Sequence, residues 1–512
     1  MNKFNNPILE GFSPDPSICV VGEDFYLATS TFCYFPGVPI YHSRDLVNWT
    51  QIGNAIHRES QVNFEGITHS NGIFAPTLRC HNGTFYMITT NVPNGGNFIV
   101  TATDPSGPWS EPYFLEEAPG IDPSLFFDED GRCYYTGTRE NPKGANYNGD
   151  WEVWLQELDL KTMKLVGVST KLWKGALREA IWPEGPHLYK RGEYYYLMIA
   201  EGGTSFEHAI TVARSRNIAG PYLGNPRNPI LTHRHLGRNF PVHNVGHGDL
   251  VETIDGKWYM TCLASRIYDG HSNLGRETFL AEITWEDEWP VVNAGHGKLL
   301  MEQEHQLNLQ PVTSKIRFDF KEGLDIAFLK LRNAKSKFYA IDKGKLQLST
   351  LMHTLKDLET PAYLGLRQQS MWYTLETEMT FLPLQEGEEA GLAIMQNNKY
   401  HIRFVLGKFE GKKQLRVITT EEKMDKLDKA YDINDSQLYL RIQGNKQDLS
   451  FSYSIDGQNY HQIIDGVNAR ILSTEIAGGF VGCTMGMYTT SNHQETKNHA
   501  EFAYLLLKED KN

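Results

Sequence analysis

The chain has 512 residues, of which 40% are hydrophobic and 22% charged, so its length predicts two to four globular domains and its composition is not that of a disordered protein. Its 49 Lys and Arg against 62 Asp and Glu give a formal net charge of −13, which argues against a nucleic acid or an anionic membrane as partner. Aromatic residues make up 12% of the chain. This enrichment is typical of β-rich folds and of sugar-binding sites, where pyranose C–H faces stack on aromatic rings.

One sequence frame recurs five times in the N-terminal part of the chain. It consists of a small or acidic residue, usually near a proline, an apolar run, a turn with glycine and an aromatic-rich run, and Asp15-Pro16 begins the first copy. Each copy predicts a β-hairpin, because Asn-Gly and Asp-Gly turns favour positive φ. Five units with room for four strands each predict a five-bladed β-propeller over residues 1–306. The turn glycines lie 61, 48, 61 and 64 residues apart, at Gly22, Gly83, Gly131, Gly192 and Gly256.

Three of the five copies carry an acid just before their first strand. These acids are Asp15, Asp122 and Glu184, and we interpret them as occupying the same place in the first, third and fourth blades. Because the first strand of every blade lines the central axis, the three carboxyls should converge at one mouth of the propeller. Carboxyls held together in an aromatic-rich cavity disfavour joint ionisation, and this is the arrangement that acid/base chemistry uses. The alternative for Glu184 alone is a solvated loop acid, stiffened by the prolines on either side of it.

The repeated frame ends near Gln303, and the pattern of apolar and polar residues changes there. Residues 307–315 read as a linker, and the many short alternating strands over 316–512 predict a two-sheet β-sandwich. The charged stretch 423–429 predicts a solvated loop. The glycine-rich stretch 478–482 has two interpretations: a bulge within the sandwich, or a loop that brings Phe480 close to another surface.

The six cysteines are scattered, with no C-x-x-C pair and no zinc-binding spacing. We interpret them as buried free thiols of a reducing compartment. Residues 1–11 contain one Lys and no apolar core of a secretory signal, and no run approaches the ~20 apolar residues of a membrane helix. We therefore expect a cytoplasmic protein without a membrane partner.

Five motifs together resemble glycoside hydrolase family 43. GFSPDPS at 11–17, GIDPS at 120–124 and EGPH at 184–187 resemble its three acidic motifs, and GHGD at 246–249 and GRET at 275–278 resemble its later motifs. Any one of these motifs is weak, but five in order along matching repeats are specific. The resemblance covers the whole chain and implies an all-β fold, a five-bladed β-propeller catalytic domain followed by the concanavalin-like β-sandwich of β-xylosidase and α-L-arabinofuranosidase members.

The resemblance implies a role for each of the three acids. Asp15 would be the general base that activates water, Glu184 the general acid that protonates the leaving oxygen, and Asp122 the group that orients Glu184 and tunes its pKa. The family is described as inverting, a mechanism that requires room for a water between base and acid. Glu184, beside Trp182 and near Asp122, should have a raised pKa, whereas a more solvated Asp15 should stay ionised.

The resemblance also implies a sugar-binding set and no cofactor for the chemistry. Arg276 resembles the arginine that hydrogen-bonds hydroxyls of the terminal sugar; the alternative is a surface ion pair with Glu277. His247 resembles a histidine near the axis that in some members lies beside a bound calcium or a water, so a Ca²⁺ ligand and a purely structural histidine both stay open. The remaining candidates are aromatic, and for any single one core packing is the alternative. They are Phe32, Phe35, Phe74, Trp182 and Phe480.

One departure from the family pattern concerns specificity. Phe74 stands where β-xylosidase members usually have Trp, and Phe covers less of a sugar and lacks the N–H donor. The first hypothesis is an exo-acting glycosidase that removes terminal β-D-xylosyl units from xylo-oligosaccharides, and the alternative is an α-L-arabinofuranosidase or an enzyme with both activities. A non-catalytic carbohydrate-binding propeller is a weaker hypothesis, because it does not need three acids. A protein-binding scaffold is weaker because the WD-type signatures of such blades are absent. The sequence leaves open whether the chain forms a homo-oligomer.

Overall fold

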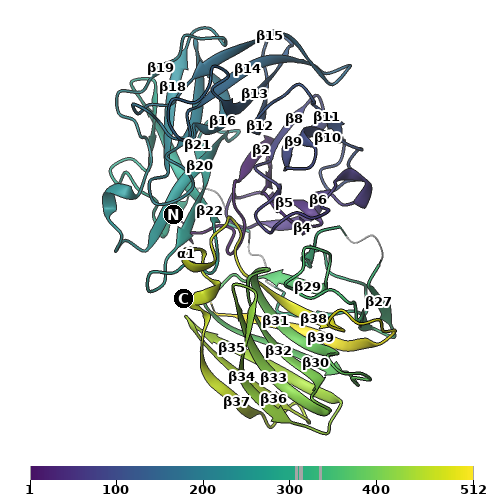
Figure 1. Cartoon of the computed structure of the whole chain (residues 1–512). Coiled ribbons are helices and arrows are strands. Elements are labelled where there is room, and N and C mark those ends of the chain that lie inside the picture. Colours follow the sequence, from purple (N-terminus) through teal and green to yellow (C-terminus); the bar gives the residue numbers. More distant parts are fainter. Residues whose placement is uncertain (1, 306–308, 311–314, 334–336, 511–512) are drawn as a thin grey trace.

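The computed structural model describes residues 2–305, 309–310, 315–333 and 337–510, and the regular elements in these ranges are almost all β-strands (Figure 1). Two domains are visible, with the N-terminal one built from five antiparallel sheets of four principal strands each. The first strand of each sheet contacts the first strand of the next, and the fifth returns to the first, so the sheets form a closed ring. The structure thus confirms the five-bladed β-propeller.

Each blade follows chain order from the axis outward. Blade one contains β2 (Ser17–Val21), β3 (Asp24–Ala28), β5 (Gly37–Ser43) and β6 (Thr50–Ile56). Blade two contains β8 (Thr77–His81), β9 (Thr84–Val92), β10 (Gly96–Ala102) and β11 (Tyr113–Phe114), with β7 (Gly72–Ile73) also paired to β9. Blade three contains β12 (Ile121–Phe127), β13 (Cys133–Glu140), β14 (Trp151–Asp159) and β15 (Lys164–Trp173). Blade four contains β16 (Glu184–Arg191), β17 (Tyr194–Glu201), β18 (Ala209–Ser215) and β19 (Leu223–Gly224). Blade five contains β20 (Val242–Glu252), β21 (Trp258–Arg266), β22 (Glu277–Glu286) and β23 (Trp289–Val292).

The turn glycines of the repeated frame adopt the backbone conformation that the sequence predicts. All five have φ between 58° and 82°, which is strained for other residues and ordinary for glycine. The ends of the ring are joined by the N-terminal segment, since β1 (Asn2–Asn5) pairs with β24 (Glu302–His305). Asn6 adds side-chain hydrogen bonds to the carbonyl groups of Leu280 and Leu300, so the first residues clamp blade five.

The C-terminal domain is a sandwich of two antiparallel sheets around a large apolar core, as predicted. A four-residue helix, α1 (Thr474–Ala477), precedes β38, and no helix within the described ranges is long and apolar enough to span a membrane. The larger sheet contains β25 (Arg317–Asp319), β27 (Tyr339–Asp342), β28 (Lys345–Ser349), β39 (His499–Glu509), β30 (Trp372–Thr380), β35 (Gln437–Asn445), β36 (Asp448–Ser454) and β37 (His461–Asn468). The smaller one contains β29 (Ala362–Arg367), β38 (Thr484–Thr490), β31 (Glu389–Asn397), β32 (Tyr400–Phe409), β33 (Lys412–Glu421) and β34 (Met424–Asp432).

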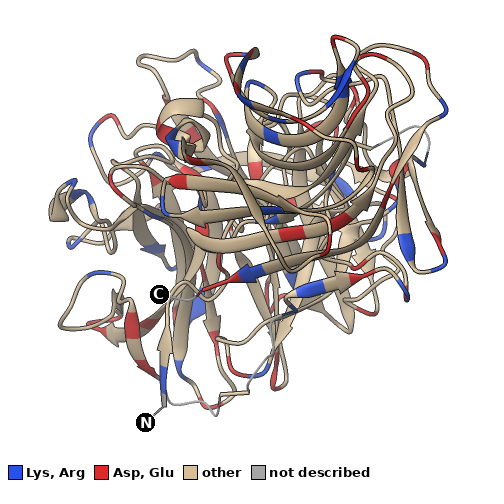
Figure 2. Ribbon diagram, turned by 90° about the horizontal axis from the view of Figure 1, so that it is seen from below, with Lys and Arg blue, Asp and Glu red and all other residues tan. Residues whose placement is uncertain are grey.

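The predicted loop at 423–429 is wrong, because most of it lies in β34, the last strand of the smaller sheet. Its alternating charges are those of an exposed edge strand, whose hydrogen bonds come from the hairpin with β33. Acidic and basic residues are likewise interspersed along strands and loops in the view of Figure 2. Of the predicted linker 307–315, only residues 309, 310 and 315 are described, and the Gln310 N–H donates to Asp45 Oδ2 at 2.6 Å.

The two domains share a strand pairing and an apolar cluster. β26 (Lys330–Leu331) of the sandwich part pairs with β4 (Tyr34–Phe35) of blade one. The backbones also approach closely elsewhere: a Cβ on Gly275 would lie 2.7 Å from Cα of Gly482. In Figure 1 the yellow segment that follows α1 reaches up into the propeller. This docking carries residues 478–482 to the propeller axis.

Candidate active site

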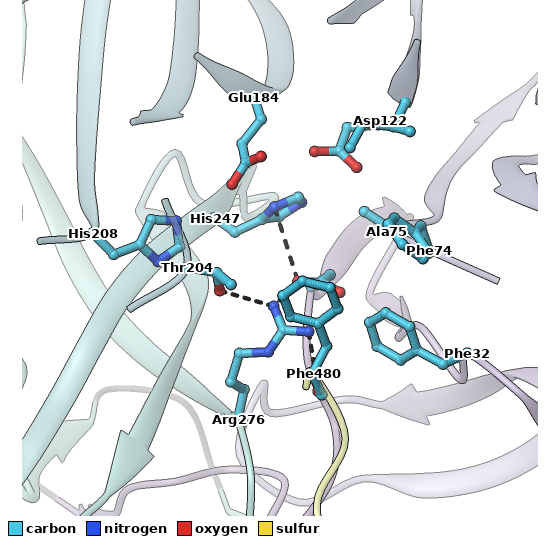
Figure 3. A pocket seen from close by; sticks show the side chains of 12 residues that line it. Phe32, Phe74, Ala75, Asp122, Glu184, Thr204, His208, His247, Arg276 and Phe480 are labelled. Atoms are coloured by element: carbon cyan, nitrogen blue, oxygen red, sulfur yellow. Dashed lines mark hydrogen bonds and ion pairs between the residues drawn. The ribbon is translucent and has the colours of Figure 1, made fainter. Parts of the chain in front are cut away.

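A single pocket at the end of the propeller axis gathers residues from all five blades and from the sandwich (Figure 3). Glu184 and Asp122 lie on one side of the pocket, and Arg276, which pairs with Asp15, lies across from them, with two histidines and three phenylalanine rings completing the lining. The acids predicted from the repeats therefore do converge. The lining residues are Asp15, Phe32, Phe74, Ala75, Ile121, Asp122, Glu184, Thr204, His208, His247, Arg276 and Phe480.

A left-handed residue stands at the same place in four blades, and in three of them its side chain points toward the axis. Asp15 and Asp122 both have φ 53°, and His247 has φ 46°. The register of β12 shifts beside Asp122, and that of β20 shifts around His247. Positive φ in residues other than glycine is strained and persists only where the surroundings enforce it. The frame thus holds these three side chains in positions that an ordinary strand would not provide.

Glu184 does not occupy the same place as the two aspartates, which corrects the interpretation from the repeats. In blade four the left-handed residue is Gly185, with φ 57°, and Glu184 stands one residue earlier. A side chain at 185 would meet the ring of His247, because a Cβ there would lie 2.9 Å from Cε1 and Nδ1. The pairing of Glu184 with Ala200 corresponds to that of Ile121 with Thr138 in blade three. The acid of blade four therefore enters the pocket from the adjacent position.

Asp15 is buried and ionised. Arg276 Nη1 donates to its Oδ1 at 3.0 Å, the Ser30 hydroxyl donates to its Oδ2, and Nδ1 of His247 lies 4.0 Å from Oδ1. Burial by itself would raise the pKa of Asp15, but Arg276, His247 and the Ser30 hydroxyl together hold that pKa below its ordinary value. The lowered pKa agrees with the predicted ionisation, whereas the predicted solvation is wrong: Asp15 is buried, and its charge is stabilised by an ion pair and not by solvent.

The pKa values of Glu184 and Asp122 are raised, whereas that of Asp15 is lowered. Burial raises the pKa of Glu184 well above its ordinary value, and the neighbouring Asp122 and Asp15 carboxylates raise it further. Burial also raises the pKa of Asp122 to about 6, opposed by His247 and by the Gly185 N–H, which donates to Oδ2 at 3.1 Å. A proton in this cluster resides on Glu184, since two carboxylates oppose its ionisation. The pocket therefore holds an ionised carboxylate and a protonated carboxyl together.

Arg276 connects the base, the wall of the pocket and the sandwich. Besides Asp15 it donates to Thr204 Oγ1 at 3.0 Å and to the carbonyl oxygen of Phe480 at 3.2 Å. Its buried Nε has no hydrogen-bond partner. The alternative ion pair with Glu277 does not form, because Glu277 pairs with Arg266 at 2.7 Å. Arg276 therefore presents a free N–H donor from within a fixed ion pair.

Three phenylalanine rings form one wall of the pocket. The centroid of Phe32 lies 5.2 Å from that of Phe74 and 5.9 Å from that of Phe480, and Phe74 and Phe480 are 6.2 Å apart. The Phe480 N–H donates to Ser70 Oγ at 2.9 Å, which fixes the sandwich loop against blade two. Of the two interpretations of 478–482, the structure supports the one that brings Phe480 to another surface.

Two predicted sugar-binding residues do not line the pocket. Phe35 belongs to β4 and is 4% exposed, because it pairs with Lys330 between the domains. Trp182 is 37% exposed and packs beside Gly203 and Gly149, outside the lining set. Thr204 and His208 were missed, since they lie on the turn between β17 and β18, where no repeated motif marks them. Ala75 holds in blade two the frame position of Asp15 and Asp122, and Ile121 directly precedes Asp122, so both could have been found from the repeats.

The calcium hypothesis for His247 finds little support in the side chains around it. Calcium prefers six to eight oxygen ligands, and the carboxylate that lies 4.0 Å from His247 belongs to Asp15, which already pairs with Arg276. Within the described part of the chain, no three His, Cys, Asp or Glu residues form a group that could hold a metal ion. The neighbour across from His247 is His187, with ring centroids 6.5 Å apart.

An ionised and a protonated carboxyl in one aromatic-walled pocket at a propeller axis define an acid/base glycosidase. The comparison with known families agrees: a model described as "Glycosyl hydrolases family 43" matches residues 4–290, and one described as "Beta xylosidase C-terminal Concanavalin A-like domain" matches residues 315–508. The chain belongs to glycoside hydrolase family 43.

Known relatives match along the whole chain. A "Xylosidase/arabinosidase" of Butyrivibrio fibrisolvens is 49% identical over 514 residues, which cover 99% of each protein. A "Non-reducing end alpha-L-arabinofuranosidase" of Bacteroides ovatus is 37% identical over 98% of this chain and 93% of its own. Among solved structures, a xylan beta-1,4-xylosidase from Bacillus halodurans C-125 has a TM-score of 0.92 at 33% identity, with 99% of this chain and 100% of that chain covered.

Proposed function

We propose that this enzyme removes terminal β-D-xylosyl units from xylo-oligosaccharides with inversion at the anomeric carbon. The observation that carries the proposal is the opposite protonation of Asp15 and Glu184 in one pocket. Asp15 takes a proton from water, and the water oxygen attacks the anomeric carbon. The bond to the leaving oxygen breaks as Glu184 transfers its proton to that oxygen, so the leaving group departs as an alcohol.

The remaining pocket residues support this division of labour. Asp122 acts on the proposed acid. Its carboxylate raises the pKa of Glu184 and accepts a hydrogen bond from the N–H of Gly185, the next residue in the chain. Arg276 and the wall of Phe32, Phe74 and Phe480 suit hydroxyls and a C–H face of one sugar. Exo-action is supported by the sandwich, because Phe480 reaches the pocket from the second domain.

An α-L-arabinofuranosidase activity is the second candidate, alone or beside the first. Phe74 favours it, because a phenyl ring in place of indole leaves more room and less stacking area on that wall. The relatives named above include a xylosidase/arabinosidase and an arabinofuranosidase, which supports either specificity.

The deciding experiment compares aryl β-D-xyloside and aryl α-L-arabinofuranoside side by side, with proton NMR following the first-formed anomer. The proposal requires faster hydrolysis of the xyloside and release of α-xylose first. Faster hydrolysis of the arabinofuranoside selects the second candidate, and near-full activity of Glu184→Ala on both would remove the proposed acid.

For localisation we propose the cytoplasm. All six cysteines are free thiols, and five of them are buried. Thiols that persist without disulfides support a reducing compartment. Fractionation of the native host, followed by activity assay of each fraction, tests the proposal.

A further inference from the structure

His208 is built into the pocket wall by backbone features of the next blade. Its Nδ1 lies 3.0 Å from the carbonyl oxygen of Asn244, and a carbonyl can only accept, so Nδ1 carries the proton. Asn244 has φ 61°. A Cβ on Gly246 would lie 2.1 Å from Cε1 of His208, so only glycine leaves space for the ring. Blade five thus provides both the partner and the room for a side chain of blade four.

The opposite ring nitrogen faces no protein partner. Nε2 of His208 is buried and has no hydrogen bond, although the residue lines the pocket and is 1% exposed. Burial lowers the pKa of His208 to about 4, so the ring is neutral at ordinary pH and Nε2 bears a lone pair. Figure 3 shows the imidazole projecting into the pocket beside Thr204. A buried acceptor without a partner is unfavourable, and a bound group that donates a hydrogen bond removes the penalty.

Several other polar groups of the pocket already have hydrogen-bond partners. Asp15 is engaged by Arg276 and Ser30, and Asp122 accepts the N–H of Gly185. Thr204 Oγ1 accepts from Arg276. Arg276 supplies donors, whereas a sugar hydroxyl both donates and accepts. A neutral acceptor is therefore the complement that Arg276 lacks.

We propose that Nε2 of His208 accepts a hydrogen bond from one hydroxyl of the terminal sugar and thereby fixes the orientation of that sugar in the pocket. The inference rests on the proposed glycosidase function. It makes His208 a substrate-binding residue on the wall that carries Thr204, with a role separate from proton transfer.

Two substitutions separate the two ring nitrogens. His208→Asn retains an amide N–H near Nδ1 but has no atom near Nε2, whereas His208→Gln places an amide oxygen near Nε2. On the aryl glycoside that the wild type hydrolyses, kcat/KM of His208→Asn should fall roughly 5- to 150-fold, as for loss of one hydrogen bond that leaves a buried partner. His208→Gln should recover most of that loss.

Deoxy substrates identify the hydroxyl. The variants and the wild type are assayed on analogues of the aryl glycoside that lack one hydroxyl each. With the analogue that lacks the bound hydroxyl, His208→Asn and wild type should have equal kcat/KM, while the loss persists on the others. The inference is overturned if the loss is the same on every analogue, or if His208→Gln is no better than His208→Asn.

His233 provides a matched control outside the pocket. Its Nδ1 also faces a carbonyl, that of Val242 at 2.8 Å, but its Nε2 accepts the Leu299 N–H at 3.0 Å. His233→Asn should lower the melting temperature, and its effect on kcat/KM should be the same for every deoxy analogue. If that effect instead disappears with the same analogue as the effect of His208→Asn, the inference is overturned.

A measurement on the wild type covers the case in which His208→Asn does not fold. In ¹⁵N-labelled protein titrated with D-xylose and L-arabinose, the unprotonated Nε2 resonance of His208 should move on accepting a hydrogen bond. An unmoved resonance at saturating sugar overturns the inference. If the wild type hydrolyses neither aryl glycoside, the proposed function fails and this inference with it; if it hydrolyses one and no coupling is found, only the inference fails.

Discussion

Arg276 ties the proposed base to the second domain, since one of its nitrogens donates to Asp15 at 3.0 Å and the other to the carbonyl oxygen of Phe480 at 3.2 Å. The same guanidinium thus stabilises the charge of the base and holds the loop that completes the aromatic wall. Ionisation of Asp15 and docking of the sandwich loop are consequently not independent.

Arg276→Ala should raise the pKa of Asp15, because burial then acts with less opposition. The base works only when ionised, so the acidic limb of the kcat/KM profile should move to higher pH, with a loss of about 10- to 100-fold at the optimum. The pH dependence of kcat/KM on the aryl glycoside measures both. Arg266→Ala is the control, since Arg266 pairs with Glu277 outside the pocket lining and should affect stability only. An unmoved acidic limb in Arg276→Ala would contradict the assignment.

Glu184→Gln should slow hydrolysis of substrates with poor leaving groups about 10²- to 10⁴-fold, because the proton donor is removed. An aryl glycoside with an acidic phenol should suffer far less, since its leaving group departs without a proton. Steady-state kinetics on a series of aryl glycosides of graded leaving-group pKa gives the comparison.

Glu201 offers a matched control for this substitution. It is a buried glutamate of the same blade, its pKa is also raised by burial, and its Oε2 accepts the Ala176 N–H at 2.8 Å. Glu201→Gln should show equal effects on good and poor leaving groups. A flat dependence on leaving group in Glu184→Gln as well would refute its role as the acid.

Asp122→Asn should lower the pKa of Glu184, because the Asp122 carboxylate is the largest charge that opposes its ionisation, after burial itself. The acid works only when protonated, so the basic limb of the kcat/KM profile should move to lower pH. Asp130→Asn is the control, since Asp130 is exposed on the β12–β13 turn and pairs with Arg132. A basic limb that stays in place, or moves upward, would show that Asp122 does not tune Glu184.

The repeats predicted the propeller because the backbone conformation at each repeated position requires a particular kind of residue. Turn glycines need φ > 0, and an acid before Pro at the start of a blade recurs because the left-handed bulge there recurs. The offset of Glu184 could have been found in the sequence, because Gly185 stands between Glu184 and Pro186, whereas Asp15 and Asp122 directly precede a Pro. Its cause could not, since it depends on the ring of His247 occupying the space over Gly185. Phe35 was misassigned for a similar reason: its partner, Lys330, lies in the other domain.

Residues without a motif were not predictable at all. His208 and Thr204 lie on a turn of ordinary composition, and only packing against Gly246 and Arg276 places them in the pocket. The strand at 424–432 was mistaken for a loop because an edge strand exposed to water carries the same alternating charges as a solvated turn. Local signals therefore located the frame and its acids, while the remainder of the site depends on contacts between blades and between domains.

Phe480→Ala should weaken substrate binding, although Phe480 belongs to the second domain and lies outside every propeller motif. Its ring stacks 5.9 Å from Phe32, and its removal takes about one aromatic contact from the sugar, worth roughly 10-fold in kcat/KM. KM should change more than kcat, because the ring contacts sugar in the ground state as well. A kcat loss with constant KM would mean that the loop acts on catalysis through Arg276, and Ser70→Ala, which frees the Phe480 N–H, should then reproduce it.

Phe74→Trp should shift the enzyme toward xylosides. Phe74 lies on the pocket wall, 5.2 Å from Phe32 and 6.2 Å from Phe480, and an indole there covers more of a pyranose face and adds an N–H donor. The ratio of kcat/KM for aryl β-D-xyloside over aryl α-L-arabinofuranoside should rise about 3- to 10-fold. Phe74→Leu, which removes stacking without adding a donor, should lower activity on both substrates and leave the ratio near that of the wild type. A ratio that falls in Phe74→Trp would show that the larger ring crowds the pyranose, and that the phenyl ring at 74 itself favours the xylosyl unit.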